Sequence, residues 1–203
     1  MHFPKRLTQP YRDVGDLFGR YWRAYGGFSA LLASPYLHFS VVLTVLLWPS
    51  WVSHKWWETT LQVVPSILGF TLAGFTIWLG FGDEKFQQLL AKRPNGKSTS
   101  AYVGISAAFV HFIVVQLLAV VAALIGEATD FPLSTNNQLQ PMVTILAPIG
   151  HFFGYLLFVY SLMTALAATF GVFRTADWFE RTRRKGVEQE GDKPSSSDSS
   201  GSS

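Results

Sequence analysis

Apolar and charged positions fall into long separate blocks along this chain. Four stretches, residues 36–53, 60–81, 101–126 and 142–173, contain no Asp, Glu, Lys or Arg, although the chain has 13 acidic and 16 basic residues. A helix needs about 20 apolar residues to cross a hydrocarbon core that is about 30 Å thick. The pattern therefore predicts an all-α membrane protein with four transmembrane helices. The length of 203 residues is that of a single domain.

The basic residues predict the orientation of these helices. Five Lys and Arg precede the first stretch, four lie between the second and third, and six follow the fourth, whereas Lys55 is the single one in the remaining connections. Basic residues are retained on the cytoplasmic side of a membrane. We therefore expect both termini in the cytoplasm, in a bacterial inner membrane. The net charge of +3 reflects this bias and does not indicate nucleic-acid binding.

The tryptophans fit the same topology. Indole prefers the boundary between hydrocarbon and headgroups, because its ring is apolar and its N–H needs a hydrogen-bond partner. Four lie near the end of the first stretch and three at the expected cytoplasmic edges, namely Trp48, Trp51, Trp56, Trp57, Trp22, Trp78 and Trp178. We expect all seven at the two membrane surfaces.

The segments outside the stretches divide the chain further. Residues 11–25 repeat apolar side chains at helical spacing opposite charged ones, which predicts an interfacial amphipathic helix within an N-terminal cytoplasmic segment, residues 1–32. Such a helix either anchors the protein or senses lipid or a partner. The transmembrane domain covers residues 33–173. A cytoplasmic helical extension, residues 174–187, and a disordered Ser-rich tail, residues 188–203, follow it.

The second stretch carries a stripe of small or weakly polar residues. Its members Ser66, Gly69, Ala73, Thr76 and Gly80 recur at alternating steps of three and four, which places them on one helix face. Small residues permit close helix contact in lipid, so we expect the packing seam of the bundle. A pore-lining face or a seam between protomers would give the same pattern.

Two histidines are the candidate ligand-binding residues. His111 and His151 each lie about ten residues into an apolar stretch, from opposite sides, so both are expected near the middle of the bilayer. Two facing imidazoles would suit a haem, a metal ion or a proton relay. Imidazole also serves as an ordinary interhelical hydrogen-bonding group, and this is the simpler interpretation.

Catalytic patterns are lacking in the sequence. Residues 95–98 read NGKS, but the upstream glycine of a phosphate-binding loop is replaced by Ala91. The chain has no cysteine, and no nucleophile, base and orienting acid are grouped together. The sequence predicts no enzyme, no metal site and no cofactor.

The function expected from these features is that of an interaction or sensing module. It would work in the lipid bilayer with a cytoplasmic protein partner or as a homo-oligomer, without nucleic acid. Two alternatives stay open, an oligomeric channel or membrane-permeabilising effector lined by the stripe, and a haem-binding electron carrier using His111 and His151.

Overall fold

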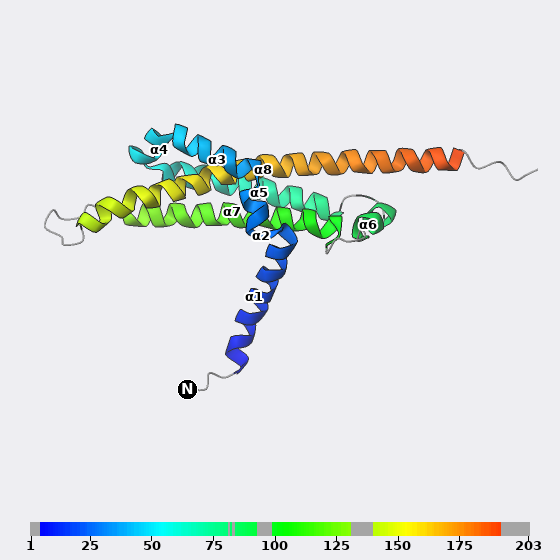
Figure 1. Cartoon of the computed structure of the whole chain (residues 1–203), viewed down its shortest axis with the longest axis horizontal. Helices are drawn as coiled ribbons and strands as arrows, with labels where there is room; N and C mark the ends of the chain where they lie inside the picture. The colour runs from blue at the N-terminus through cyan, green and yellow to red at the C-terminus, as the bar shows by residue number, and fades with distance from the viewer. Residues whose placement is uncertain (1–4, 81, 83, 93–98, 131–139, 192–203) are drawn as a thin grey trace, which may run out of the picture.

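The computed structural model describes residues 5–80, 82, 84–92, 99–130 and 140–191 (Figure 1). Within these ranges the secondary structure is entirely α-helical. The helices are α1 (Lys5–Tyr25), α2 (Gly27–Leu32), α3 (Pro35–Leu46), α4 (Trp48–Val52), α5 (Trp56–Gly80), α6 (Glu84–Ala91), α7 (Ala101–Thr129) and α8 (Gln140–Gly191).

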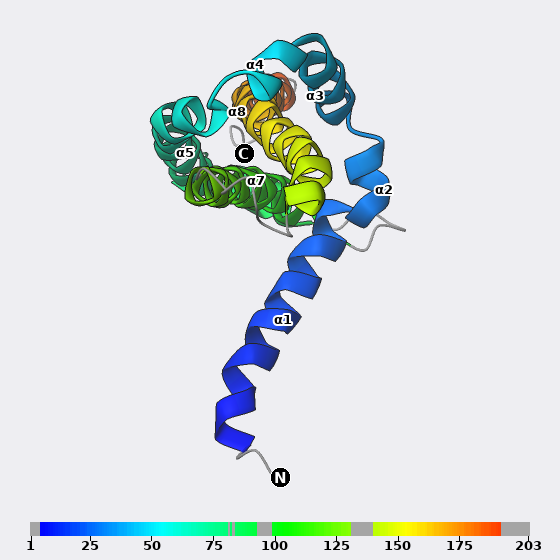
Figure 2. The same ribbon diagram turned by 90° about the vertical axis from the view of Figure 1, so that its left-hand side faces the viewer.

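Helices α5, α7 and α8 pack side by side and form the helical body, and α3 lies along α8 (Figures 1 and 2). Three segments, Trp56–Gly80, Ala101–Thr129 and Leu146–Arg184, are long and apolar enough to cross a membrane. Large apolar side chains such as Phe70, Leu124 and Phe153 are exposed on their outer faces. Lipid accommodates such a surface, and the chain is an integral membrane protein.

The first apolar stretch does not form a long helix. It divides into α3, which has 12 residues, and α4, which has five. At 1.5 Å per residue α3 extends about 18 Å, well short of a hydrocarbon core of about 30 Å. Pro49 in the first turn of α4 has no N–H to donate to the preceding turn, so the helix breaks at Leu47. The predicted count of four spanning helices is therefore not confirmed.

Two apolar clusters hold the helical body together. The Trp56 cluster comprises Trp56, Trp57, Val64, Ala123, Tyr155, Phe158 and Val159. The Trp78 cluster comprises Trp78, Phe86, Leu90, Phe109 and Ala168. The indoles of Trp56, Trp57 and Trp78 are at most 5% exposed. Three of the seven tryptophans expected at the membrane surfaces are thus packing residues inside the protein.

Glycine allows the close approach of helices at the Trp56 cluster. A Cβ at Gly154 of α8 would overlap the Trp56 ring, and a Cβ at Gly126 of α7 would lie 3.3 Å from the Trp57 ring. The small polar residues buried nearby bond to their own helices. The Thr60 hydroxyl, for example, donates to the Trp56 carbonyl at 3.0 Å. Such a bond satisfies a buried hydroxyl in an apolar interior without a partner from another helix.

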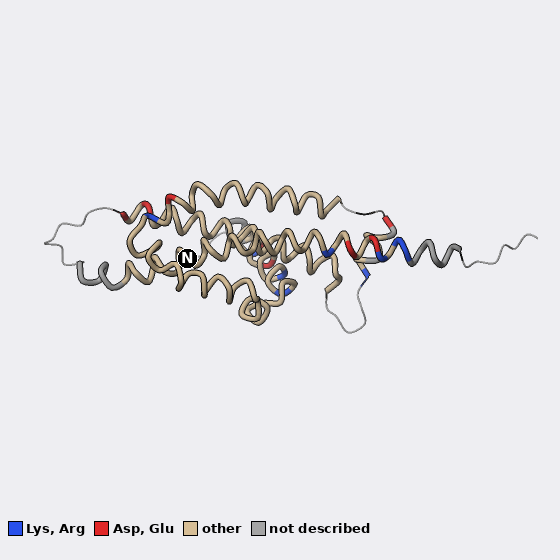
Figure 3. The backbone as a smooth tube through the Cα atoms, turned by 90° about the horizontal axis from the view of Figure 1, so that it is seen from above, with Lys and Arg blue, Asp and Glu red and all other residues tan. Residues whose placement is uncertain are grey.

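Helix α1 projects away from the helical body (Figures 1 and 2). A break in the helix follows it, because Gly26 and Gly27 have φ angles of 107° and 67°, in the left-handed region that favours glycine. Charged residues of the described chain occur on α1 and toward the two ends of the body, and an uncharged zone of the body separates these ends (Figure 3).

The end of the body opposite Lys55 carries the extension of α8. This helix continues without interruption to Gly191, so it includes the expected extension at 174–187 and the first residues of the expected tail. The Phe86 ring of α6 packs edge-on against Phe179 with centroids 5.1 Å apart. The rest of the tail, residues 192–203, and the sequence NGKS at 95–98 lie outside the described residues.

Candidate functional site

The best-defined polar site in the described part of the chain lies where α1 meets the helical body. Its members Tyr21, Tyr25, His111 and Tyr160 come from α1, α7 and α8, and we call them the α1 junction. His111 is only 4% exposed, and the other two helices close around its ring. Tyr21 is 90 positions away from His111 in the sequence and Tyr160 is 49 positions away, yet both contact its ring here.

Both nitrogens of His111 have hydroxyl partners. The Nδ1 atom lies 2.9 Å from the Tyr21 hydroxyl, and Nε2 lies 3.0 Å from the Tyr160 hydroxyl. A neutral imidazole has one donor and one acceptor nitrogen. Tyr21 donating to Nδ1, and Nε2–H donating to Tyr160, satisfies both. Tyr160 then has its own proton free to donate to the Tyr25 side chain, with which it is hydrogen-bonded.

Aromatic contacts add to these hydrogen bonds. The Tyr25 ring stacks on His111 with centroids 3.9 Å apart and an interplanar angle of 20°. Trp22 packs edge-on against Phe28 of α2 at 4.9 Å. Burial, with a smaller contribution from Tyr25, raises the pKa of Tyr21 to about 12, so this phenol stays neutral and able to donate at physiological pH. The junction therefore attaches α1 to the body without using a formal charge.

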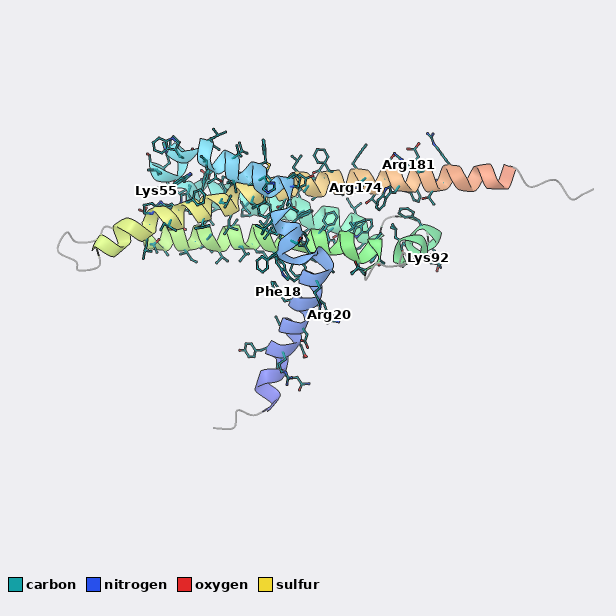
Figure 4. The ribbon with its side chains drawn as sticks, viewed as in Figure 1. Phe18, Arg20, Lys55, Lys92, Arg174 and Arg181 are labelled. Carbon is teal, nitrogen blue, oxygen red and sulfur yellow. The ribbon has the colours of Figure 1, made fainter. Side chains whose placement is uncertain are left out.

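An apolar cleft of about 370 Å³ opens beside the junction. Phe18 and Trp22 of α1, Leu37 of α3, Leu118 of α7 and Phe153 of α8 contribute to its walls, and His111 and Tyr160 lie at one end. The cleft extends from the junction toward later residues of α7 and earlier residues of α8. Because α7 and α8 are antiparallel, this is the direction of the Lys55 end of the body (Figure 4).

A second hollow, of about 310 Å³, lies on the opposite side of α1. It is lined by Arg20 together with Tyr102, Val103 and Ser106 from the first turns of α7. Figure 4 accordingly shows Phe18 and Arg20 on opposite sides of α1, with Arg20 on the side toward Lys92. Phe18 and Arg20 thus face opposite ends of the body.

His151 lies elsewhere. Its Nδ1 atom is 3.3 Å from the Trp51 carbonyl oxygen, and its ring packs edge-on against Trp57. Tyr160, which bonds His111, is nine residues further along α8, or about 13 Å. The structure therefore does not bring His111 and His151 together, and the facing pair that a bis-histidine haem requires is not formed within one chain.

The stripe on α5 faces outward. Ser66, Gly69, Ala73, Thr76 and Gly80 are all exposed, and a Cβ at Gly69 or Gly80 would meet no atom within 4 Å. The Thr76 hydroxyl donates to the Leu72 carbonyl at 3.0 Å. The face that packs in the body instead carries Thr60, Val64 and Thr71. These five residues are thus not the packing seam of the single chain.

A polar pair joins α5 and α7 inside the body. Gln116, which is fully buried, donates through Nε2 to the Thr71 hydroxyl at 2.9 Å. Its Oε1 atom has no hydrogen-bond partner. The donated bond fixes the register of the two helices, since a buried amide strongly favours the arrangement in which it is bonded.

Sequence reasoning found His111 but missed the tyrosines that surround it. Tyr21 and Tyr25 belonged to the expected interfacial helix, and Tyr160 was one aromatic residue in a long apolar stretch. The available signal was the spacing of Tyr21 and Tyr25, which are four apart and therefore on one helix face. This spacing indicates a hydrogen-bonding site only once His111 of α7 is known to lie against that face.

The chemistry available at the junction is neutral hydrogen bonding and apolar contact. Within the described residues no cluster of three or more histidine or acidic side chains is arranged to hold a metal ion. Comparison of the chain with protein-family models, curated proteins and solved structures finds no match.

Proposed function

We propose that this chain is a non-enzymatic interaction module of a bacterial inner membrane, which couples its membrane-embedded helices to a protein partner in the cytoplasm. One observation carries the proposal: α8 continues unbroken from the body into an exposed extension. Phe179 near the start of this extension packs on Phe86 of the Trp78 cluster. A shift of the embedded helices would therefore be transmitted to the extension as a rigid-body movement.

The orientation of α1 supports placing the extension in the cytoplasm. The Phe18 side of α1 faces the Lys55 end of the body, and the Arg20 side faces the end with Lys92 and Arg181 (Figure 4). An amphipathic helix lying in the inner interface directs its apolar side to hydrocarbon and its basic side to water. Lys55 at the other end forms an ion pair with Asp130 at 2.8 Å, which neutralises the single exception to the charge asymmetry.

The first crossing in this arrangement is made by α2, α3 and α4 together. They lead from α1 to the start of α5 at the Lys55 end (Figure 1). A short apolar segment is accommodated where the bilayer thins locally, at a cost of a fraction of a kcal/mol for each Å of mismatch. With this crossing, α1 and the end of α8 lie on the same side. His111, which contacts Tyr21 of α1, then lies at the depth of the interface and not in the middle of the bilayer as expected from the sequence.

The extension offers a charged surface suited to a protein partner. Arg181 pairs with Asp177 at 3.0 Å and Arg184 with Glu180 at 2.6 Å, and these groups are largely exposed. Exposed pairs of this kind stabilise a helix by only about 0.3–0.5 kcal/mol. Alternating charge of this sort contributes more to the specificity and rate of protein association than to folding.

A second candidate function is self-association through the stripe of α5. The outward position of Gly69 and Gly80 favours it, because small residues let a helix of another copy approach closely in lipid. The channel alternative requires the same face to surround a pore, and it predicts a conductance that changes in Thr76→Leu.

Site-specific crosslinking tests the main proposal. The chain has no cysteine, so Thr182→Cys provides a unique site on the extension for a photoactivatable reagent, in membranes of cells that produce the protein naturally. We expect one discrete heterologous adduct, and none from Leu124→Cys on the outer face of α7. The absence of any adduct from the extension would contradict the proposal, and an adduct of two chains would support self-association.

A charge-swapped variant separates recognition from helix stability. Exchanging Asp177 with Arg181, and Glu180 with Arg184, keeps both i,i+4 pairs but reverses the charge pattern. We expect the adduct to disappear while the helix content is retained. An unchanged adduct would show that the partner does not recognise the order of these charges.

A further inference from the structure

We infer that the cleft beside the α1 junction binds one acyl chain of a glycerophospholipid from the leaflet in which α1 lies. The inference depends on the membrane placement given above, but not on the cytoplasmic partner. The volume of the cleft, about 370 Å³, falls in the range of about 300–1,000 Å³ that is usual for ligand sites. Side chains of α1, α2, α3, α7 and α8 all reach it, so it is a built site rather than a gap between two helices.

The lining of the cleft favours a single acyl chain over a helix of a second copy. In lipid, helices associate through small residues that let their backbones approach closely. The cleft is lined instead by bulky side chains such as Phe18, Trp22 and Phe153. These leave a space for a flexible hydrocarbon chain and no close-packing face for another helix.

The polarity of the cleft follows the polarity of a lipid leaflet. His111 and Tyr160 lie at the end beside α1, and the walls become fully apolar at Leu118 and Phe153. From His111 to Leu118 the cleft follows seven residues of α7, or about 10 Å. A leaflet has its ester groups at the interface and its methylenes toward the midplane, so a lipid chain entering beside α1 meets polar groups first and apolar groups after.

The charges around the cleft indicate where the headgroup lies. No Asp, Glu, Lys or Arg of the described chain lines the cleft, and a phosphate inside it would be buried without a partner. Arg20 and Arg23 are exposed on α1, with Arg20 directed to the opposite hollow. The phosphate therefore stays at the level of these guanidinium groups, outside the cleft.

Lipid retention during purification tests the site. The full chain is purified in mild detergent from phosphatidylglycerol- and phosphatidylethanolamine-containing membranes, and bound lipids are extracted and identified by mass spectrometry. Leu157→Trp fills the cleft, and Leu166→Trp adds the same bulk to an exposed position of the same helix. We expect retained phospholipid to fall about tenfold in Leu157→Trp, equivalent to about 1.4 kcal/mol of binding. We expect no change in Leu166→Trp.

Equal retention in the two variants would overturn the inference, and recovery of an isoprenoid in place of a phospholipid would overturn the assigned source. Photolabelling of the unaltered protein gives a second test, which remains valid if Leu157→Trp does not fold. In phosphatidylglycerol vesicles containing a phospholipid with an acyl-chain diazirine, residues 114–118 and 153–157 should be labelled more strongly than Phe70 and Leu72, which are exposed on α5 at the depth of Gln116. Uniform labelling of all outer faces would contradict a specific site.

Discussion

The Trp56 cluster and the α1 junction are built on opposite principles. In the Trp56 cluster large rings fill the space against Gly126 and Gly154, and little room is left. At the junction hydroxyl and imidazole groups bond one another beside a cleft of about 370 Å³. Close packing stabilises one arrangement and resists change, whereas a polar contact next to a cavity can open at lower cost. The comparison places rigidity in the first region and the capacity to change conformation in the second.

Gly154→Ala gives the largest effect expected from this comparison. The added Cβ overlaps the Trp56 ring, which is enclosed by two helices and cannot move aside. Overpacking of this kind costs typically about 1–3 kcal/mol, so the midpoint of thermal unfolding in detergent should fall. Gly150→Ala on the same helix is the control, because its Cβ meets no atom within 4 Å. An equal loss in both variants would contradict the close packing at Trp56.

His111→Ala is expected to release α1. It leaves the Tyr21 and Tyr160 hydroxyls without their shared partner, at a cost of about 1–3 kcal/mol. Hydrogen exchange of residues 19–25 should accelerate, by about tenfold for each 1.4 kcal/mol lost. His151→Ala removes one long contact in the other region and should leave this exchange unchanged. Similar protection of α1 in both variants would show that the junction does not hold the helix.

Gly69→Leu is expected to have the smallest effect on a single chain. The side chain would point away from the body, and exposed substitutions usually change stability by less than about 0.5 kcal/mol. Gly74→Leu on the same helix is the comparison, because a Cβ there already lies 3.7 Å from Phe109. Gly74→Leu should therefore lower the unfolding temperature clearly. A large loss in Gly69→Leu, accompanied by dissociation of an oligomer, would favour self-association through the stripe.

Composition and periodicity predicted the elements better than their partners. The helical class and three of the spanning segments follow from runs of apolar residues. The division of the first stretch at Leu47 was also readable from Pro49, but an uncharged stretch of 18 residues outweighed it. Periodicity identifies the faces of a helix but not which face a neighbour covers. Both faces of α5 carry small or hydroxyl-bearing residues, so the sequence favoured the stripe as the interior face. In the structure the interior face is instead the one that carries Thr60 and Thr71.

The candidate site was less predictable, because it depends on contacts between distant segments. His111 stood out as a polar residue in an apolar stretch, but its depth alone paired it with His151 rather than with Tyr160. The position of α1 against α7 decided the outcome, and no periodicity within either helix encodes that contact. The same holds for the cleft, whose walls come from five helices.

The depth of the two sides of α1 tests the central claim most directly. Spin labels are attached to Phe18→Cys and, separately, to Arg20→Cys in the otherwise cysteine-free chain, reconstituted in vesicles. If α1 lies in the interface with its apolar side toward the hydrocarbon, the label at position 18 is relaxed mainly by oxygen, which concentrates in lipid. The label at position 20 is then relaxed mainly by a water-soluble nickel complex. Equal accessibility of both labels to the nickel complex would contradict the account.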